Sequence, residues 1–324
     1  MTRIGVVGAT GAVGTVALEL LAERHFDDVR AFASSRSAGT TVRFGDRELD
    51  VEEATPEALA AGGLDLCFFS VGTAASRDLV PHAVRGGAVC IDKSDAFRLA
   101  DGVPLVVAGV NDDVLDQIEL PPPHPLTPGT GVVANPNCSA IQLSCVLKPL
   151  EEAAGITRVR LATYQSASGA GDAGIERLRG TPTGAADLAM DWELEGDEYS
   201  EEAKLRGETR KVLSLPDLPL QANCVRVPVM VGHAQAIWVE TKEALTPDQA
   251  RAVLSAAPHV RLADLATPGE AAGADEVLIG RVRRDPTVDN GLLLWTVCDN
   301  LRKGAALNAI QIAELLLARR LLAA

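Results

Sequence analysis

The most constraining feature of this sequence is a run of glycines that begins at Gly8. Residues 3–14 read Arg-Ile-Gly-Val-Val-Gly-Ala-Thr-Gly-Ala-Val-Gly, an apolar strand pattern that leads through Gly8, Gly11 and Gly14 into a helical pattern. Glycines at such a bend permit a tight turn and let the backbone approach a pyrophosphate at the helix N-terminus. The spacing is a variant of the dinucleotide fingerprint and predicts a Rossmann-type domain. A glycine-rich turn in an unrelated α/β protein is the alternative interpretation.

The segments after this turn alternate between short apolar strands and helices. Strands are expected at 29–33, 64–70 and 88–92, with a hairpin arm at 43–51 and helices from 55 and from 74 to 85. This order predicts a doubly wound parallel sheet. The second half has longer alternating segments, at 159–165, 224–233, 236–240, 277–284 and 292–298. They predict an α+β domain with a mixed sheet and helices on one side, followed by a broad-faced apolar helix over 305–322.

The loop after the second strand bears on the choice of nicotinamide cofactor. A fold that prefers NAD usually has Asp or Glu here to bind the ribose 2′-hydroxyl. This chain has Ser34-Ser-Arg-Ser37 instead. An arginine among hydroxyl groups fits a 2′-phosphate, so we predict NADP as the cofactor. An exposed loop arginine without a ligand is the alternative.

Cys138 differs from the other five cysteines in its surroundings. It lies in Asn135-Pro-Asn-Cys-Ser139, directly before an apolar helical pattern, and Asn137 and Ser139 are good capping residues. At a helix N-terminus, unpaired backbone N–H groups and the helix dipole favour the thiolate. The motif alone leaves two interpretations open: a reactive thiolate, or a small buried cysteine at a helix start.

Other residues fit the same chemistry. Arg98 follows the strand at 88–92, at the sheet edge where ligands collect in open parallel sheets, and could bind an anion. A thiolate beside a nicotinamide cofactor is the arrangement that aldehyde oxidation needs, because the thiohemiacetal loses hydride and becomes a thioester. A histidine that takes and returns a proton at the oxygen would complete the set.

Composition and charge exclude several classes of protein. The net charge of −14 and the lack of a basic run argue against nucleic-acid binding. No window of roughly 18 apolar residues predicts a membrane span. The chain starts with a strand pattern and not with a signal-peptide layout, so we expect a cytoplasmic protein. The cysteines form no C-x-x-C pair and the histidines show no ligand spacing, so neither a disulfide framework nor a metal site is expected.

A series of motifs along the chain resembles the aspartate-semialdehyde dehydrogenases. They are Gly8-Ala-Thr-Gly-Ala-Val-Gly14, Asn135-Pro-Asn-Cys-Ser139, Tyr164-Gln-Ser-Ala-Ser-Gly-Ala-Gly171, Glu208-Thr-Arg-Lys211, Arg226-Val-Pro-Val-Met-Val-Gly-His233 and Asp299-Asn-Leu-Arg-Lys-Gly-Ala-Ala306. The series, and not any single motif, carries the resemblance. It implies reversible, NADP-dependent reductive dephosphorylation of L-aspartyl 4-phosphate to L-aspartate 4-semialdehyde. That step belongs to the biosynthesis of lysine through diaminopimelate, and of threonine and methionine.

The resemblance also assigns roles to individual residues. It implies that Cys138 forms the acyl thioester and that His233 is the acid/base. Gln165 and Arg226 would orient the substrate, with Arg226 on its α-carboxylate, and Glu201 would meet its ammonium group. The phosphate-binding groups would be Lys204, Arg98 and Asn137. The cofactor contacts would be Gly8, Thr10, Gly11, Ala12, Val13, Arg36, Ser37, Ser168, Gly169 and Asn300.

The same resemblance implies how the domains are arranged. An NADP-binding domain would comprise 1–134 and 303–324, because the last helix of the family returns to it. The catalytic and dimerisation domain would comprise 135–302. The family forms homodimers or dimers of dimers, so a homodimer or homotetramer is expected.

The chain departs from the family pattern in two places. Lys93 and Asp95 stand where the family often has Asn and Ser, which changes the charge expected near Arg98. Between Thr183 and Tyr199, the sequence Gly-Ala-Ala-Asp-Leu-Ala-Met-Asp-Trp-Glu replaces an aromatic and Pro-containing segment. Because of that replacement, the resemblance does not predict the local cofactor contacts or part of the dimer surface.

Three further alternatives remain. Either Glu201 or Glu202 could meet the ammonium group, and only the three-residue spacing to Lys204 favours Glu201. An N-acetyl-glutamyl-phosphate reductase would use the same chemistry on an acylated substrate, whose uncharged nitrogen needs no Glu201. A non-catalytic nucleotide-binding paralogue would typically have lost the nucleophile or the base, and this chain keeps both Cys138 and His233.

Overall fold

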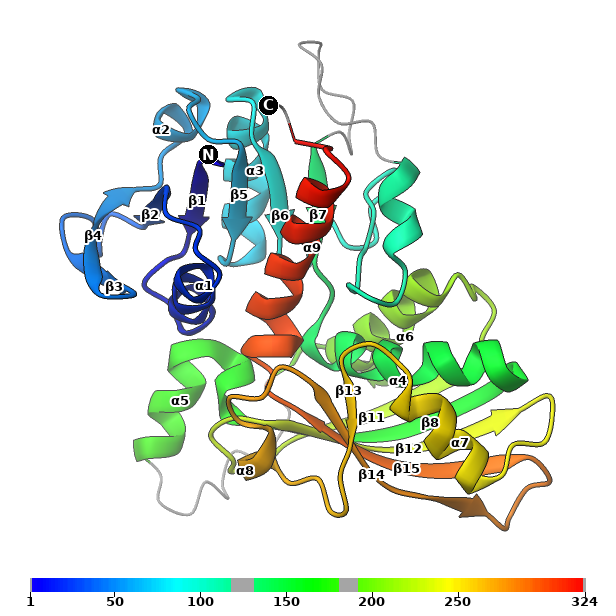
Figure 1. The fold of residues 1–324 in the computed structure, drawn as a ribbon. Coiled ribbons are helices and arrows are strands. Elements are labelled where there is room, and N and C mark those ends of the chain that lie inside the picture. The colour runs from blue at the N-terminus through cyan, green and yellow to red at the C-terminus, as the bar shows by residue number, and fades with distance from the viewer. Residues whose placement is uncertain (1, 118–130, 181–191, 323–324) are drawn as a thin grey trace. The chain divides into compact units, whose positions relative to one another are not determined.

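The computed structural model describes residues 2–117, 131–180 and 192–322 (Figure 1). The chain divides into two compact units, which we call unit 1 (Met1–Pro136 with Ala305–Ala324) and unit 2 (Asn137–Gly304). The Pro- and Gly-rich run from Pro121 to Gly131 lies outside the described residues except for Gly131, and so does most of the segment 184–193. Within the described ranges, no helix is long and apolar enough to cross a membrane, and no group of potential ligand side chains is arranged to hold a metal ion.

Unit 1 contains a seven-stranded sheet in the order β3-β4-β2-β1-β5-β6-β7. Neighbouring strands pair in parallel except β3 and β4, which form an antiparallel hairpin, so the predicted doubly wound sheet is confirmed. The strands are β1 (Ile4–Val7), β2 (Val29–Ala33), β3 (Thr41–Phe44), β4 (Arg47–Glu53), β5 (Leu66–Phe69), β6 (Val89–Asp92) and β7 (Val132–Ala134). The helices between them are α1 (Ala12–Glu23), α2 (Pro56–Ala60), α3 (Thr73–Arg85) and the 3₁₀ helix Asp112–Gln117.

The core of unit 1 explains why its central strands are uniformly apolar. Every residue of β1 and β5 is buried, as expected for parallel strands that are covered on both faces. One cluster of buried side chains joins the sheet to α1 and to the last helix, α9 (Leu307–Ala318). The two ends of the chain therefore build one core.

The last helix is shorter than the sequence pattern predicts. A π-helical turn, Arg302–Ala306, precedes α9, which ends at Ala318 and not at Leu322. Arg320 has a φ of 55°, which turns the chain out of the helix. Leu321 and Leu322 still pack against the core of unit 1, so the apolar pattern continues past the helix end.

Unit 2 is built on a six-stranded mixed sheet in the order β11-β8-β12-β15-β14-β13. Its strands are β8 (Ile156–Gln165), β11 (Leu220–Arg226), β12 (His233–Thr241), β13 (Val260–Leu262), β14 (Val277–Asp285) and β15 (Gly291–Cys298). The pairs β8/β11 and β13/β14 are parallel and the other pairs are antiparallel, so the predicted mixed sheet is confirmed. A small hairpin, β9 (Leu194–Glu195) and β10 (Glu198–Tyr199), stands apart from this sheet.

Helices α4 (Cys138–Ala154), α6 (Ser200–Leu213) and α7 (Pro247–Ser255) lie on one face of the sheet of unit 2 (Figure 1). Helices α5 (Gly171–Gly180) and α8 (Pro268–Ala271) also belong to unit 2. The single strand expected at 224–233 is wrong: β11 ends at Arg226 and β12 begins at His233. Pro228 cannot donate to a sheet ladder and Gly232 has a φ of +105°, so the chain turns between the two strands.

Candidate active site

One end of the sheet of unit 2 collects most of the predicted catalytic and substrate-binding residues. Strands β8 and β11 are parallel and end opposite one another, with Gln165 in register with Arg226. Strand β12 runs the other way and begins with His233, which is in register with Cys298 at the end of β15. These strand ends meet at one edge of the sheet, so Gln165, Arg226 and His233 lie next to one another on neighbouring strands. All three side chains are buried.

Cys138 is the first residue of α4, as the capping motif predicts. The Asn137 side chain caps the helix, and its Oδ1 accepts the backbone N–H groups of Ser139 (2.8 Å) and Ala140 (3.4 Å). Gly304 packs closely against Cys138, since a Cβ atom at position 304 would lie 3.1 Å from that of Cys138. The predicted helix start is confirmed, and the thiol, which is partly exposed, lies at the positive end of the helix dipole.

The residues on either side of Cys138 are tied to α6 and β8 by hydrogen bonds. The carboxylate of Glu201 accepts both Asn137 Nδ2 (3.0 Å) and Gln165 Nε2 (2.8 Å). Gln165 Nε2 also lies 2.5 Å from Ser139 Oγ. Glu201, Gln165 and the start of α4 therefore form one buried polar cluster around the cysteine.

The structure separates the roles of Glu201 and Glu202. Both oxygens of Glu202 accept backbone N–H groups, from Tyr199 in a capping box (2.9 Å) and from Cys224 in β11 (2.8 Å). Glu202 therefore holds α6 against the sheet, whereas Glu201 binds Gln165 and Asn137, the residue before Cys138. Lys204 follows Glu201 by three positions in α6.

Glu208 is a functional candidate that the sequence reasoning did not single out. Its Oε2 accepts the backbone N–H of Asn137 at 2.6 Å, and the side chain is buried. A carboxylate that binds the residue before Cys138 fixes where α4 begins. Glu208 is part of the Glu208-Thr-Arg-Lys211 motif, but that motif alone does not indicate a contact with Asn137.

Arg226 is held from two sides. Its Nη1 donates to the carbonyl of Ser166 at 2.9 Å, and its guanidinium carbon lies 4.7 Å from the centre of the Trp192 ring. Trp192 belongs to the segment that departs from the family pattern, and nothing in the sequence pointed to this stacking. A Cβ atom at Gly169 would lie 2.7 Å from Arg226 Nη1 and 2.9 Å from His233 Nε2, so only glycine lets the loop pass beside both groups.

His233 is fully buried and bound through one ring nitrogen. Its Nδ1 accepts the backbone N–H of Ser166 (3.1 Å) and lies 2.9 Å from Ser166 Oγ. Its Nε2 has no hydrogen-bond partner among the described residues. Burial, together with the charge of Arg226, lowers the pKa of His233 to about 3, so the ring is neutral at pH 7. A buried polar atom without a partner costs about 1–3 kcal/mol, which a ligand oxygen at this position would recover.

Asn300 and Ser168, both predicted cofactor contacts, lie in the same network as His233. Asn300 Oδ1 accepts Ser166 Oγ (2.9 Å) and the backbone N–H of Gly232 (3.0 Å), and its Nδ2 donates to Ser168 Oγ (2.9 Å). This network joins the loop after β8 to the turn before β12. Gly169 belongs to the same loop.

The predicted nucleotide-binding residues Gly8, Thr10, Gly11, Ala12, Val13, Arg36 and Ser37 belong to unit 1. A Cβ atom at Gly8 would lie 2.4 Å from the carbonyl oxygen of Ser70, and one at Gly14 would lie 2.0 Å from that of Gly8. Gly11 is the N-cap of α1 and supplies no side-chain cap, which leaves backbone N–H groups at the helix start for a ligand. This glycine cradle fits a pyrophosphate. Thr10 Oγ1 donates to Ser37 Oγ (3.4 Å), and Arg36 is exposed in the same loop after β2.

Arg98 is the predicted phosphate ligand that unit 1 contributes, whereas Asn137 and Lys204 belong to unit 2. The Arg98 guanidinium is nearly buried, and it donates to the backbone carbonyls of Asn135 (3.1 Å) and Lys93. It therefore ties together the chain segments that follow β6 and β7. Asp95, one of the departures from the family pattern, accepts a hydrogen bond from the Thr73 hydroxyl.

Known proteins match the chain over nearly its whole length. The family model of the semialdehyde dehydrogenase NAD-binding domain matches residues 3–118, and the model of the semialdehyde dehydrogenase dimerisation domain matches residues 189–303. The aspartate-semialdehyde dehydrogenase of Corynebacterium glutamicum is 43% identical, with 98% of this chain and 99% of the relative covered. The chain belongs to the aspartate-semialdehyde dehydrogenase family.

Other members of the aspartate-semialdehyde dehydrogenase family agree in sequence and in structure. The Aquifex aeolicus enzyme is 40% identical, with 97% of each chain covered. The crystal structure of aspartate semialdehyde dehydrogenase II from Vibrio cholerae, complexed with ASA, superposes with a TM-score of 0.90 at 36% identity and covers 98% of each chain. An NAD-binding domain with a mostly parallel sheet, followed by a dimerisation domain with a mixed sheet, is thus common to this chain and its family.

Proposed function

We propose that the protein is an NADP-dependent aspartate-semialdehyde dehydrogenase that interconverts L-aspartyl 4-phosphate and L-aspartate 4-semialdehyde. The observation that carries the proposal is the clustering around Cys138. Its neighbours Asn137 and Ser139 bind Glu201 and Gln165, and Gln165 is in register with Arg226. This cluster offers a nucleophile, a carboxylate and a guanidinium to one small zwitterionic substrate. The non-catalytic alternative leaves such a set of buried charged groups unexplained.

Cys138 would act as the nucleophile in this reaction. Its thiolate, favoured by the N-terminus of α4, attacks the acyl carbon of aspartyl phosphate; a C–S bond forms, the C–O bond to phosphate breaks, and phosphate leaves with the electron pair. The thioester that results is the species that can accept hydride. In the reverse direction, the thiolate adds to the aldehyde, and phosphate later attacks the thioester.

The other residues of the cluster would bind and orient the substrate. Arg226, held by Ser166 and Trp192, presents a guanidinium to the α-carboxylate, and Glu201 presents a carboxylate to the ammonium group. Gln165 would orient the acyl group, and His233 would serve as the acid/base at its oxygen. Lys204, Arg98 and Asn137 would bind phosphate, which an acidic protein must attract with local positive charge. The charge of Glu201 favours an unacylated substrate over the N-acetyl-glutamyl alternative.

NADP would be held by the glycine cradle from Gly8 to Val13 and by Ser37, with Arg36 on the 2′-phosphate. When bound, the cofactor supplies or accepts the hydride. Ser168, Gly169 and Asn300 are the further contacts that we propose, in the loop that carries Ser166. The preference for NADP is supported by an arginine, and no Asp or Glu, in the loop that follows β2.

The proposal is tested by following cofactor reduction by the purified protein with L-aspartate 4-semialdehyde. We expect phosphate-dependent turnover that is at least about tenfold faster with NADP than with NAD, because Arg36 binds the extra phosphate. Arg36→Asp should reduce that ratio by about tenfold or more, and Arg43→Asp on the neighbouring hairpin is the matched control. Phosphate should be omitted in a parallel reaction.

Other outcomes of this assay would contradict the proposal in different ways. No reaction with either cofactor, but turnover of an N-acetylated glutamate semialdehyde, would favour the reductase alternative. A change in absorbance that stops at one equivalent of protein would favour a non-catalytic nucleotide-binding protein. Equal rates with NADP and NAD would contradict only the cofactor assignment.

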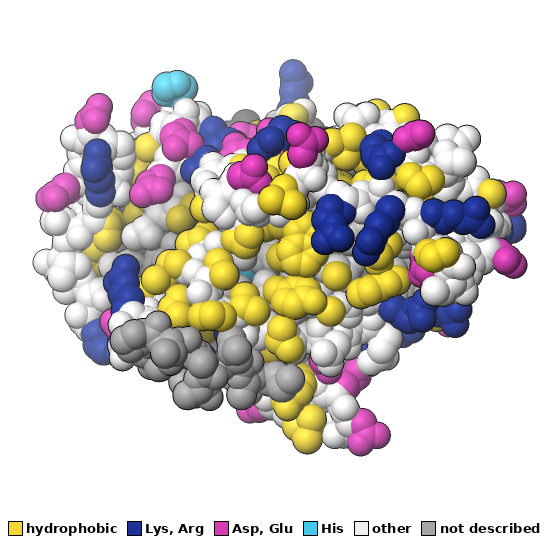
Figure 2. All heavy atoms as spheres, turned by 90° about the horizontal axis from the view of Figure 1, so that it is seen from below, with side chains coloured by type: hydrophobic (Ala, Val, Ile, Leu, Met, Phe, Trp, Pro, Cys, Tyr) yellow, Lys and Arg dark blue, Asp and Glu magenta, His cyan; other side chains and the backbone are white. Residues whose placement is uncertain are grey.

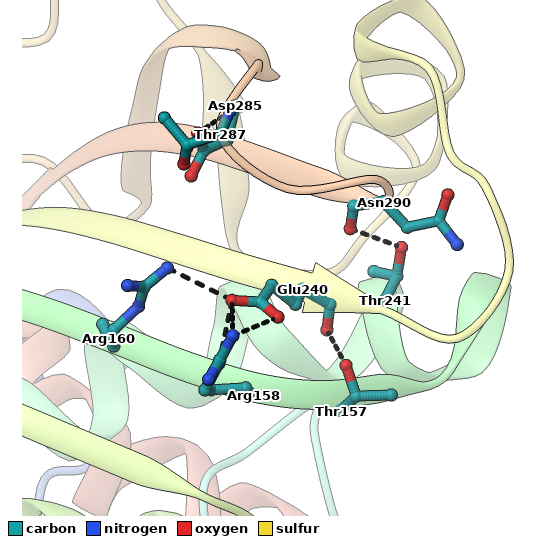
Figure 3. Close-up of polar contacts among 8 residues, drawn as sticks. All are labelled: Thr157, Arg158, Arg160, Glu240, Thr241, Asp285, Thr287 and Asn290. Carbon is teal, nitrogen blue, oxygen red and sulfur yellow. Dashed lines mark hydrogen bonds and ion pairs between the residues drawn. The ribbon is translucent and has the colours of Figure 1, made fainter.

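We also propose that unit 2 forms a homodimer through the sheet face opposite α4, α6 and α7. Hydrophobic side chains gather across this face (Figure 2), where Tyr164, Trp238 and Trp295 project from β8, β12 and β15. Tyr164 and Trp295 are in ring contact, with centroids 5.6 Å apart. Arg158 and Arg160 on β8 bind Glu240 on β12 and add a charged group on the same strands (Figure 3). A contiguous apolar face with polar surroundings is typical of a protein interface.

The dimer is tested by placing a charge on this face. Trp238→Glu should convert dimers or tetramers into smaller species at micromolar concentration, because a carboxylate would be buried in the interface without a partner. Sedimentation velocity measures the change. Leu99→Glu places the same charge at an exposed apolar residue of unit 1 and serves as the control. A wild-type protein that sediments as a monomer would overturn the proposal.

A further inference from the structure

Ser139, the residue that follows Cys138, is bound at all three of its polar groups. Its backbone N–H donates to Asn137 Oδ1 (2.8 Å), and its Oγ accepts Gln165 Nε2 (2.5 Å). Its backbone carbonyl accepts Gln235 Nε2 at 2.9 Å. Ser139 is fully buried, so these bonds are shielded from water. The backbone next to the nucleophile is thus held by the helix cap, by β8 and by β12.

The place of Gln235 on β12 connects α4 to His233. The two residues lie two positions apart on this strand, so their side chains point to the same face of the sheet. Both side chains are fully buried. Cys138 and Ser139 are consecutive residues of α4. The hydrogen bond from Gln235 therefore holds the start of α4 against the strand that carries the proposed acid/base.

A second glutamine attaches α4 to the sheet. Gln142 lies about one helical turn after Cys138, and its Nε2 donates to Thr296 Oγ1 on β15 (2.8 Å). Its Oε1 accepts a hydrogen bond from Cys298 Sγ on the same strand (3.3 Å). Thr296 is in register with Gln235 on β12. The N-terminal part of α4 is therefore bound to two adjacent strands through amide side chains.

The stability of the core does not explain why Gln235 is a glutamine. Its Oε1 is buried and has no hydrogen-bond partner in the described part of the chain, which is unfavourable. The amide cannot be reversed, because Nε2 must face the carbonyl of Ser139 and a carbonyl only accepts. That carbonyl can also bind the backbone N–H four residues further along the helix. An apolar side chain would avoid the unpaired oxygen, so the benefit of Gln235 lies in where it holds α4.

We propose that Gln235 is a positioning residue that fixes the Cys138 thiol relative to His233, with Gln142 as a second attachment of α4. The inference rests on the proposed function, since both groups must reach one acyl group of the same substrate. Gln235 acts through Ser139 and does not contact the substrate. Rates of attack depend steeply on such placement, and a displacement of about 1 Å can cost about 10²-fold.

The test replaces Gln235 by methionine in the full-length enzyme. Methionine is an unbranched side chain without an N–H group, so Ser139 loses one bond and the unpaired oxygen disappears. We expect kcat for L-aspartate 4-semialdehyde to fall by about 10- to 100-fold. KM for the semialdehyde and for NADP should stay within about threefold, because Arg226 and the glycines of unit 1 are unchanged. The Tm should stay within about 3 °C of that of the wild type.

Thiol chemistry separates positioning from a structural role. Titration of the reactive thiol counts the folded sites, so kcat is expressed per reactive Cys138. Alkylation by iodoacetamide should keep its rate within about twofold, because a small reagent needs no alignment with His233. A structural role would lower the Tm and the number of reactive thiols and leave kcat per thiol unchanged. That result would overturn the proposal, and so would alkylation slowed in proportion to kcat.

Two further variants complete the kinetic test. Ser144→Ala is the matched control, since Ser144 lies on α4, is fully buried and has an Oγ without a partner among the described residues. Its kcat should stay within about twofold of the wild type. Gln142→Met should lower kcat per thiol by about three- to tenfold, because one attachment of α4 is lost. A loss in Ser144→Ala equal to that in Gln235→Met would overturn the specific role of Gln235.

Hydrogen exchange tests the attachment without any turnover. Backbone amides at 141–143 should exchange about tenfold faster in Gln235→Met than in the wild type, because the start of α4 opens more readily. Amides near the end of α4, at 150–153, should be unchanged. Equal exchange at 141–143 in the two proteins would overturn the proposal. Absence of turnover in the wild type would instead contradict the proposed function, and the exchange rates would still report whether Gln235 holds α4.

Discussion

Cys138→Ala is expected to lower turnover of aspartate semialdehyde by about 10⁴-fold or more, while NADP affinity stays within about threefold. Without the thiolate, no thiohemiacetal forms, and an aldehyde cannot readily lose hydride. The fingerprint glycines that we assign to NADP belong to unit 1 and are unchanged by the substitution. Stopped assays of cofactor reduction and fluorescence titration with NADPH measure the two quantities.

Cys145→Ala is the matched control for this experiment. Cys145 lies two turns further along α4, is fully buried, and has a pKa that burial raises, so it is an unreactive thiol on the same helix. Its replacement should leave turnover within about twofold of the wild type. Alkylation of the wild type should modify Cys138 first and abolish activity in step. Substantial activity in Cys138→Ala would exclude the thioester mechanism.

Arg226→Lys is expected to lower kcat/KM for aspartate semialdehyde by about 10²- to 10³-fold. Lysine keeps the charge but loses the planar fork that can bind both oxygens of a carboxylate. It also loses the stacking on Trp192 and the hydrogen bond to the Ser166 carbonyl that orient the guanidinium. A lost hydrogen bond to a charged group costs about 1.5–3 kcal/mol, and the lost stacking adds about 0.5–2 kcal/mol, which sets the expected range.

Initial rates over a range of semialdehyde concentrations measure this effect, which should appear mainly as a raised KM. Arg251→Lys is the control, since Arg251 makes comparable hydrogen bonds to Asp248 and Val282 on the surface of unit 2. Trp192→Leu should produce a smaller change in the same direction. An unchanged KM in Arg226→Lys would mean that another group binds the α-carboxylate.

The fold was largely predictable because it depends on local and periodic signals. Three elements were predictable from local residue types that are typical of only a few structures. They are the strand at 29–33, the helix cap at Asn137 and the glycine turn after β1. The errors occurred where apolar residues continue without regular structure. Leu321 and Leu322 pack on the core after α9 has ended, and Val227 to Val231 look like a strand although Pro228 and Gly232 interrupt the ladder.

The site was only partly predictable because much of it depends on contacts between distant segments. The spacing to Lys204 favoured Glu201, but only the structure shows that Glu202 is occupied by the N–H groups of Tyr199 and Cys224. Trp192 on Arg226 joins residues 34 positions apart with no shared motif. The backbone hydrogen bonds of Ser166 to His233 and Arg226 cannot be predicted from the serine side chain, because almost every residue type offers the same backbone N–H and carbonyl groups.

The discontinuity of unit 1 has a consequence for how the protein is made. Residues 307–318 of α9 share a core with β1 and α1, although they leave the ribosome only after the whole of unit 2. Unit 2, from Asn137 to Gly304, is complete before them. The sheet of unit 1 is thus synthesised before that of unit 2 but covered after it, and for that interval its apolar surface is open to chaperones and to aggregation.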